Sequence, residues 1–124
     1  TRMYPNGSLA ILDDCDGYND WPYGLEKLNP YMDLIGKINA KNNFISNKVD
    51  YFIAENDIDL DGITSGCQYE TLGANRFEKT INYITYLDAI YPNNDHSHTI
   101  IPNLNHSSNS FSSDVFKNYI DAIF

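Results

Sequence analysis

Two short apolar runs, separated by helical patterns, most strongly constrain the fold of this chain. Residues 49–54 (VDYFIA) and 98–102 (HTIIP) are rich in β-branched and aromatic residues and lie between turn residues, a pattern typical of buried strands. Apolar residues at helical spacing precede, separate and follow them, over residues 25–43, 74–91 and from 114 onward. This alternation predicts an α/β fold with parallel strands.

The helix expected over residues 25–43 has a recognisable start and an apolar face. Asn29 is expected to cap it and Pro30 to occupy its first turn. Its apolar stripe consists of Leu28, Tyr31, Leu34, Ile35 and Ile38. Lys and Asn residues occupy the opposite face, as in an amphipathic helix.

Two strands are too few for a complete parallel sheet. Such sheets are buried on both faces by helices and normally contain several strands. With 124 residues, the chain has room for one domain and not two. The sequence therefore predicts an incomplete architecture, with the missing strands supplied by the remainder of a larger fold or by a partner protein chain.

Charge and hydropathy exclude two classes of partner. Eight Lys and Arg against seventeen Asp and Glu give a net charge of −9, which repels nucleic-acid phosphates. No run approaches the roughly 18 apolar residues that a membrane-spanning helix needs. We therefore expect neither nucleic-acid binding nor a membrane span.

Cys15 and Cys67 are the only cysteines, and both lie in Gly- or Asp-rich segments. Without a CxxC motif, zinc or thioredoxin-like chemistry is not expected. A disulfide between them and two separate thiols both fit the spacing. The segments beginning at Asn6 (NGS) and Asn105 (NHS) match the N-glycosylation acceptor pattern. A disulfide and these acceptors together favour a secreted or endomembrane protein.

The residues after the two strands are the candidates for chemistry, because ligands bind beyond the carboxyl ends of parallel strands. Asp57 follows the first strand and His106 follows the second, with a helix between them. α/β-Hydrolases present the last two members of a Ser…Asp…His triad in this order.

Four blocks of the sequence resemble the C-terminal portion of α/β-hydrolase-fold proteins of the esterase and lipase type. They are residues 21–31 (WPYGLEKLNPY), 49–59 (VDYFIAENDID), 75–79 (NRFEK) and 100–107 (IIPNLNHS), and the resemblance spans residues 18–124. It implies that Asp57 is the triad acid and His106 the base. It also implies that residues 1–124 form the C-terminal part of a single α/β-hydrolase-like domain. The parallel sheet would then be incomplete, consisting of the last two strands with flanking helices.

The chain departs from that family at two points. Asn103 and Asn105 stand where glycines usually flank the histidine turn, although Asn tolerates a left-handed backbone better than most residues. No Gly-x-Ser-x-Gly motif is present, and Ser65 and Ser97 lack the strand–turn–helix context of a nucleophile. The acid and base therefore need a serine from outside these residues. The alternative is a non-catalytic structural or interaction module that has kept the fold and lost the chemistry.

A third interpretation uses the same loop as a calcium site. Asp57, Asp59 and Asp61, followed by Gly62, match the opening of an EF-hand-like loop, which uses carboxylates at alternating positions. The twelfth position is Gln68 rather than Glu, and a strand rather than a helix is expected before the loop. No other cofactor is expected. His96 and His98 are interpreted as polar residues at the entry of the second strand.

Overall fold

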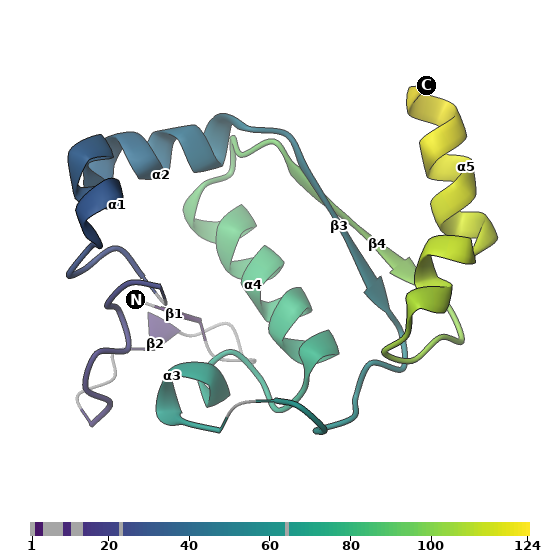
Figure 1. The fold of residues 1–124 in the computed structure, drawn as a ribbon, viewed down its shortest axis with the longest axis horizontal. Helices are drawn as coiled ribbons and strands as arrows, with labels where there is room; N and C mark the ends of the chain where they lie inside the picture. The colour runs from purple at the N-terminus through teal and green to yellow at the C-terminus, as the bar shows by residue number, and fades with distance from the viewer. Residues whose placement is uncertain (1, 4–8, 11–13, 23, 64) are drawn as a thin grey trace.

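A pair of parallel strands forms the centre of the computed structural model, which describes residues 2–3, 9–10, 14–22, 24–63 and 65–124 (Figure 1). Strand β3 (Val49–Ala54) pairs with β4 (His96–Ile101) along its whole length, from Val49 opposite His96 to Ala54 opposite Ile101. The other elements are β1 (Arg2–Met3), β2 (Leu9–Ala10), α1 (Pro30–Ile35), α2 (Lys37–Ser46), α3 (Cys67–Glu70), α4 (Arg76–Ile90), the 3-10 helix η1 (Ser108–Ser112) and α5 (Asp114–Ile123). The predicted α/β alternation with parallel strands is confirmed.

The first predicted strand has the expected bounds, and the second differs at both ends. It begins two residues earlier, so that His96 and Ser97 also lie within the strand, and it ends at Ile101, one residue before the expected end. Pro102 lacks the N–H that would continue the ladder.

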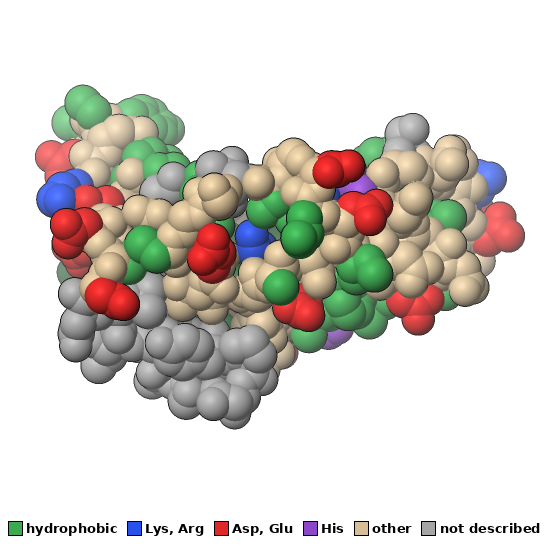
Figure 2. Space-filling model, turned by 90° about the horizontal axis from the view of Figure 1, so that it is seen from below, with side chains coloured by type: hydrophobic (Ala, Val, Ile, Leu, Met, Phe, Trp, Pro, Cys, Tyr) green, Lys and Arg blue, Asp and Glu red, His purple; other side chains and the backbone are tan. Residues whose placement is uncertain are grey.

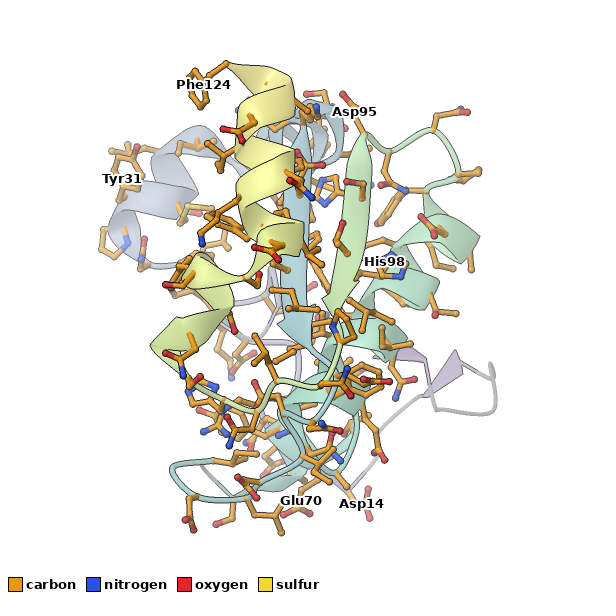
Figure 3. All side chains as sticks on the ribbon, turned by 90° about the vertical axis from the view of Figure 1, so that its right-hand side faces the viewer. Asp14, Tyr31, Glu70, Asp95, His98 and Phe124 are labelled. Carbon is orange, nitrogen blue, oxygen red and sulfur yellow. A yellow bond between two sulfur atoms is a disulfide. The ribbon has the colours of Figure 1, made fainter. Side chains whose placement is uncertain are left out.

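Helices lie on opposite faces of this sheet. In Figures 1 and 3, α4 lies on one side of β3 and β4 and α5 on the other. Successive side chains of a strand point to opposite faces. Accordingly, the ring of Tyr51 contacts Tyr83 of α4 at 6.0 Å between centroids. The next residue, Phe52, contacts Phe116 and Tyr119 of α5 at 5.0 and 4.8 Å.

Side chains cap two of the predicted helices: α5 begins at Asp114 as expected, whereas α4 begins at Arg76, two residues later than expected. The Asn75 carboxamide accepts from the backbone N–H of Glu78 at 2.9 Å and so begins α4. The Ser113 hydroxyl caps α5 in the same way by accepting from Phe116 N–H. No helix among the described residues is long and apolar enough to cross a membrane.

The predicted helix over residues 25–43 differs from the structure. Asn29 caps a helix that starts at Pro30, as expected, but Gly36 adopts a φ of +82° and breaks the segment into α1 and α2. A positive φ is readily available only to glycine, so the break lies at the one residue that permits it. The predicted apolar stripe is largely uncovered, since Tyr31, Leu34 and Ile38 are 70%, 88% and 70% exposed.

A carboxylate on β3 attaches α5 to the sheet. Asp50 accepts hydrogen bonds from the hydroxyls of Ser97 and Tyr119, and Lys48 Nζ lies 3.8 Å from its Oδ2. The bond from Ser97, then that from Tyr119, holds the pKa of the Asp50 carboxyl below its usual range. Tyr119 belongs to α5, so this network joins strand and helix.

We expect Asp50→Asn to lower the free energy of unfolding by about 1–3 kcal/mol at neutral pH, because an amide accepts these bonds more weakly than a carboxylate. A lowered folded-state pKa stabilises the protein above the unfolded-state pKa of about 3.9, and this contribution is lost as pH falls through the folded-state pKa. The difference between wild type and variant should therefore shrink below about pH 4. Urea unfolding across pH measures it, and Asp121→Asn on exposed α5 surface is the control. A gap independent of pH would exclude this role for Asp50.

Candidate functional site

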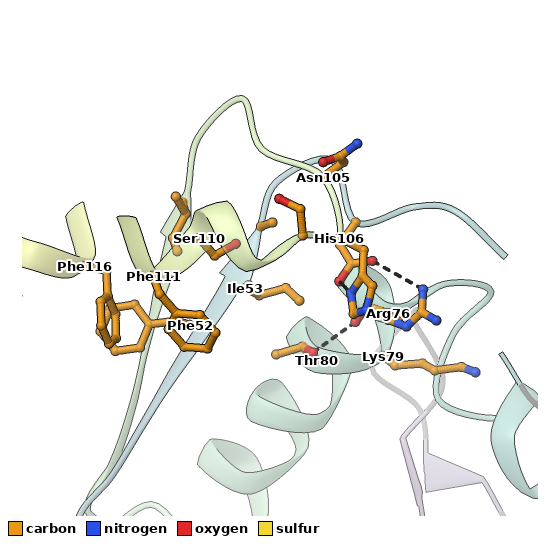
Figure 4. A pocket seen from close by; sticks show the side chains of 14 residues that line it. Phe52, Ile53, Arg76, Lys79, Thr80, Asn105, His106, Ser110, Phe111 and Phe116 are labelled. Carbon is orange, nitrogen blue, oxygen red and sulfur yellow. Dashed lines mark hydrogen bonds and ion pairs between the residues drawn. The ribbon is translucent and has the colours of Figure 1, made fainter. Parts of the chain in front are cut away.

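A pocket of about 490 Å³ lies at the carboxyl ends of β3 and β4. The residues that follow each strand form one end of it together with the start of α4, while η1 and α5 contribute the other end (Figure 4). This is the end of a parallel sheet at which ligands bind in open α/β folds.

The two loops that follow the strands are joined by their backbones. Glu55 N–H donates to the Ile101 carbonyl at 2.9 Å, and Asn56 N–H donates to the Leu104 carbonyl at 2.8 Å. The Glu55 carboxylate in turn accepts from Asn103 N–H at 2.9 Å. These bonds extend the strand pairing into the loops, so that the residues after β3 and β4 are held side by side.

Asn103, which stands where α/β-hydrolases usually have a glycine, adopts a left-handed backbone with a φ of +59°. Asn reaches this region at lower cost than most residues because its short polar side chain bonds locally. The turn that leads to His106 therefore forms without glycine at this position.

Asp57 is fixed between the end of β3 and the start of α4. Its N–H donates to the Ala54 carbonyl at 3.1 Å, and its carbonyl accepts from Phe77 N–H at 3.1 Å. Only 4% of the residue is exposed. Burial of a carboxylate is costly unless it is paired, so its partners are informative.

His106 is the first of those partners. Its Nδ1 lies 3.0 Å from Asp57 Oδ2, and its side chain is 62% exposed and lines the pocket. A carboxylate oxygen only accepts, so Nδ1 carries the proton and the Nε2 lone pair of a neutral ring is left free to accept another. The structure thus brings the two predicted triad residues into contact, with the acid buried and the base accessible.

Arg76, in the first turn of α4, is the second partner of Asp57. Its Nη1 lies 3.5 Å from Asp57 Oδ1, a buried oxygen without a hydrogen bond among the described residues. The guanidinium also donates to the carbonyls of Asp59 and Asp61, at 3.3 and 2.7 Å. Arg76 is not among the site residues predicted from the sequence. The one sequence signal for Arg76 is its place in the first turn of a helix. A cation is unfavourable there because the helix dipole is positive at that end, which indicates that another group compensates the charge.

The three candidate calcium ligands do not converge. Asp57 is buried against His106 and Arg76, whereas Asp59 and Asp61 are exposed. Their carbonyls bind the Arg76 guanidinium, a cation that repels a dication nearby. Within the described part of the chain, no three His, Cys, Asp or Glu side chains gather in a way that would hold a metal ion.

Cys15 and Cys67 form a disulfide, with 5.8 Å between their Cα atoms, as one of the two sequence interpretations predicted. It joins the residues around position 15 to the first residue of α3. The Gln68 side chain adds a hydrogen bond to the Asp16 carbonyl at 3.1 Å. Asn6, a predicted glycosylation acceptor, lies outside the described residues.

Comparisons with protein-family models, with curated proteins and with solved structures found no match for this chain.

Proposed function

We propose that this chain is the C-terminal segment of an esterase- or lipase-type α/β-hydrolase, in which Asp57 and His106 are the acid and base of a Ser-Asp-His triad. The observation that carries the proposal is the hydrogen bond between a buried Asp57 and the pocket-facing His106. The nucleophilic serine and the oxyanion hole come from outside these residues.

The pair performs the proton transfers of ester hydrolysis. As the serine oxygen attacks the ester carbonyl, His106 Nε2 takes the serine proton and the ring becomes an imidazolium, stabilised by Asp57. When the carbon–oxygen bond of the ester breaks, Nε2 returns this proton to the departing alcohol. Water then attacks the acyl-enzyme by the same route, which releases the acid and restores the serine.

Arg76 is proposed as a positioning residue in this arrangement. The second oxygen of Asp57 faces its guanidinium, so the carboxylate stays oriented with Oδ2 toward His106. Because Arg76 also holds the carbonyls of Asp59 and Asp61, it fixes the loop on which Asp57 lies.

The tautomer of His106 tests the proposal on this chain alone. We expect NMR of the imidazole nitrogens to show the Nδ1–H tautomer, with Asp57→Asn shifting it toward Nε2–H. His96 is an internal reference of the opposite kind, because its Nε2 donates to the Phe44 carbonyl at 2.8 Å while Nδ1 faces the Tyr51 hydroxyl at 3.0 Å. If His106 shows the same imidazole nitrogen shifts as the exposed His98, both in the wild type and in Asp57→Asn, the proposal is contradicted.

The source of the serine is the second part of the proposal. Within the described residues, β3 and β4 pair only with each other, which leaves both edges of the sheet open. With the exposed Tyr31, Leu34 and Ile38, this favours cover by the remainder of the fold or by a partner chain. A fluorophosphonate probe on the native protein, followed by mapping of the labelled peptide, distinguishes the two sources.

The same uncovered surfaces favour a second candidate, a non-catalytic interaction module. It predicts that the native protein is not labelled by the probe although it binds a partner. Labelling that is lost on His106→Ala would exclude it.

We also propose a secreted or endomembrane location, because disulfides persist in oxidising compartments. The supporting observation is the bond between Cys15 and Cys67. Alkylation of the native protein without reductant tests it, and two free thiols would count against this location.

A further inference from the structure

The pocket has two chemically different ends. Figure 4 shows Phe52, Phe111 and Phe116 gathered at one end, with Arg76 and His106 at the other. Ile53 lies between them. A pocket divided in this way matches a ligand with an apolar body and a polar head.

The aromatic end has apolar surface that is open to solvent. The Phe116 ring contacts Phe52 at 5.0 Å and Phe111 at 5.4 Å between centroids, both edge to face. Phe111 is nevertheless 69% exposed. Covering this surface with a hydrocarbon chain is favourable, in proportion to the apolar area removed from water.

The other end carries a positive charge without a counterion. Arg76 is paired with Asp57, but Lys79, one turn along α4, has no carboxylate within ion-pair distance among the described residues. Its Nζ lies 5.8 Å from the centre of the Tyr69 ring. Among the described residues that line the pocket, Asp57 is the only acidic one.

This positive end is unusual on an acidic protein. The chain has a net charge of −9, and acidic side chains are spread along the face in Figure 2, where basic ones are few. An unpaired lysine inside a pocket therefore favours an anion there over elsewhere on the surface.

We propose that the pocket binds an amphiphilic carboxylate, with the carboxylate at Lys79 and the apolar chain along Ile53 toward the three phenylalanines. The inference rests on the proposed function in one respect, since an amphiphilic carboxylate is the acid that hydrolysis of an ester with an apolar acyl chain would release at the same site. The head group lies at the His106 end, where an acyl group would react.

Calorimetric titration with octanoate and with octan-1-ol tests whether the pocket prefers a carboxylate over an uncharged head group. We expect octanoate to bind about tenfold more tightly, the size of one charge-assisted hydrogen bond. Lys79→Gln should remove that preference and leave octanol binding unchanged, while Lys79→Arg should retain it. Phe111→Ala should weaken both ligands.

Lys41→Gln is the matched control, because Lys41 Nζ also lies over a tyrosine ring, Tyr91, at 5.7 Å and outside the pocket. It should leave the preference intact. Equal binding of the two ligands, no binding of either, or the same loss in both lysine variants would overturn the inference. Each variant is first checked for the wild-type NMR spectrum.

The ligand-binding proposal and the proposed function can fail independently of each other. The titration needs no serine, and the tautomer measurement on His106 needs no ligand. An octanoate preference that depends on Lys79 supports the binding site even if His106 lacks the expected tautomer. The expected tautomer without any octanoate preference overturns the binding site alone.

Discussion

Replacing Asp57 by Asn in the native protein, with its serine present, is expected to lower the kcat for a p-nitrophenyl ester by about 10⁴-fold. Asn cannot stabilise the imidazolium that forms on His106, and it favours the wrong tautomer of the neutral ring. KM should change far less, because Asp57 acts on the reaction through its bond to His106 and is itself only 4% exposed. Steady-state kinetics separate the two parameters.

Asp59→Asn is the matched control for this experiment. Asp59 lies in the same loop and is exposed, and its carbonyl rather than its carboxylate contacts Arg76. We expect the kcat of Asp59→Asn to stay within about twofold of the wild-type value, because substitutions of exposed residues away from a site have small effects. If the loop binds calcium instead, Asp57→Asn, Asp59→Asn and Asp61→Asn should lower kcat to a similar extent. A chelator added to the wild-type protein should then have the same effect. That outcome would contradict the triad.

The elements that were predictable from sequence are those whose ends are set by local chemistry. Residues 49–54 combine β-branched and aromatic side chains between turn residues, and they form β3 with those bounds. Asn29, Asn75 and Ser113 each cap a helix through a bond to a backbone N–H three residues on. Such bonds depend on a few neighbouring residues, so a sequence pattern carries the information.

The differences arise where distant residues decide the structure. Helical periodicity continues through Gly36, but the chain turns there. An isolated glycine weakens a helix without requiring a break, so the sequence does not decide between the two. Residues 67–70 form the short helix α3, which lies outside the three segments that the sequence predicts to be helical. Its first residue is bonded to Cys15, a constraint that no local pattern contains.

The candidate site shows the same division. That Asp57 and His106 approach one another follows from topology, since both come after neighbouring parallel strands. That the acid is buried and the base exposed depends on the backbone bonds of Asp57 to Ala54 and Phe77. The contact with Arg76 depends on how α4 returns across the loop, and sequence spacing does not encode it.

Removal of the disulfide is expected to have the largest effect on stability. Cys15 and Cys67 are 52 residues apart, and closing such a loop restricts the unfolded chain by about 4 kcal/mol in the chain-entropy model. A domain of this size is stable by only about 5–15 kcal/mol. Urea unfolding of the Cys15→Ala, Cys67→Ala double variant should therefore show a loss of about this size.

The comparison that isolates the bond is the reduced wild-type protein, which keeps both sulfur atoms. Cys15 is only 3% exposed, so alanine there also removes a packed sulfur and should cost somewhat more than reduction alone. Hydrogen exchange should rise first in α3, which the bond holds, and last in β3 and β4, whose ladder does not involve it. Equal unfolding free energies for the oxidised and the reduced wild-type protein would contradict the stabilisation expected from the chain-entropy model. Two free thiols on alkylation of the native protein would show that the bond does not form, and would remove the argument for an oxidising compartment.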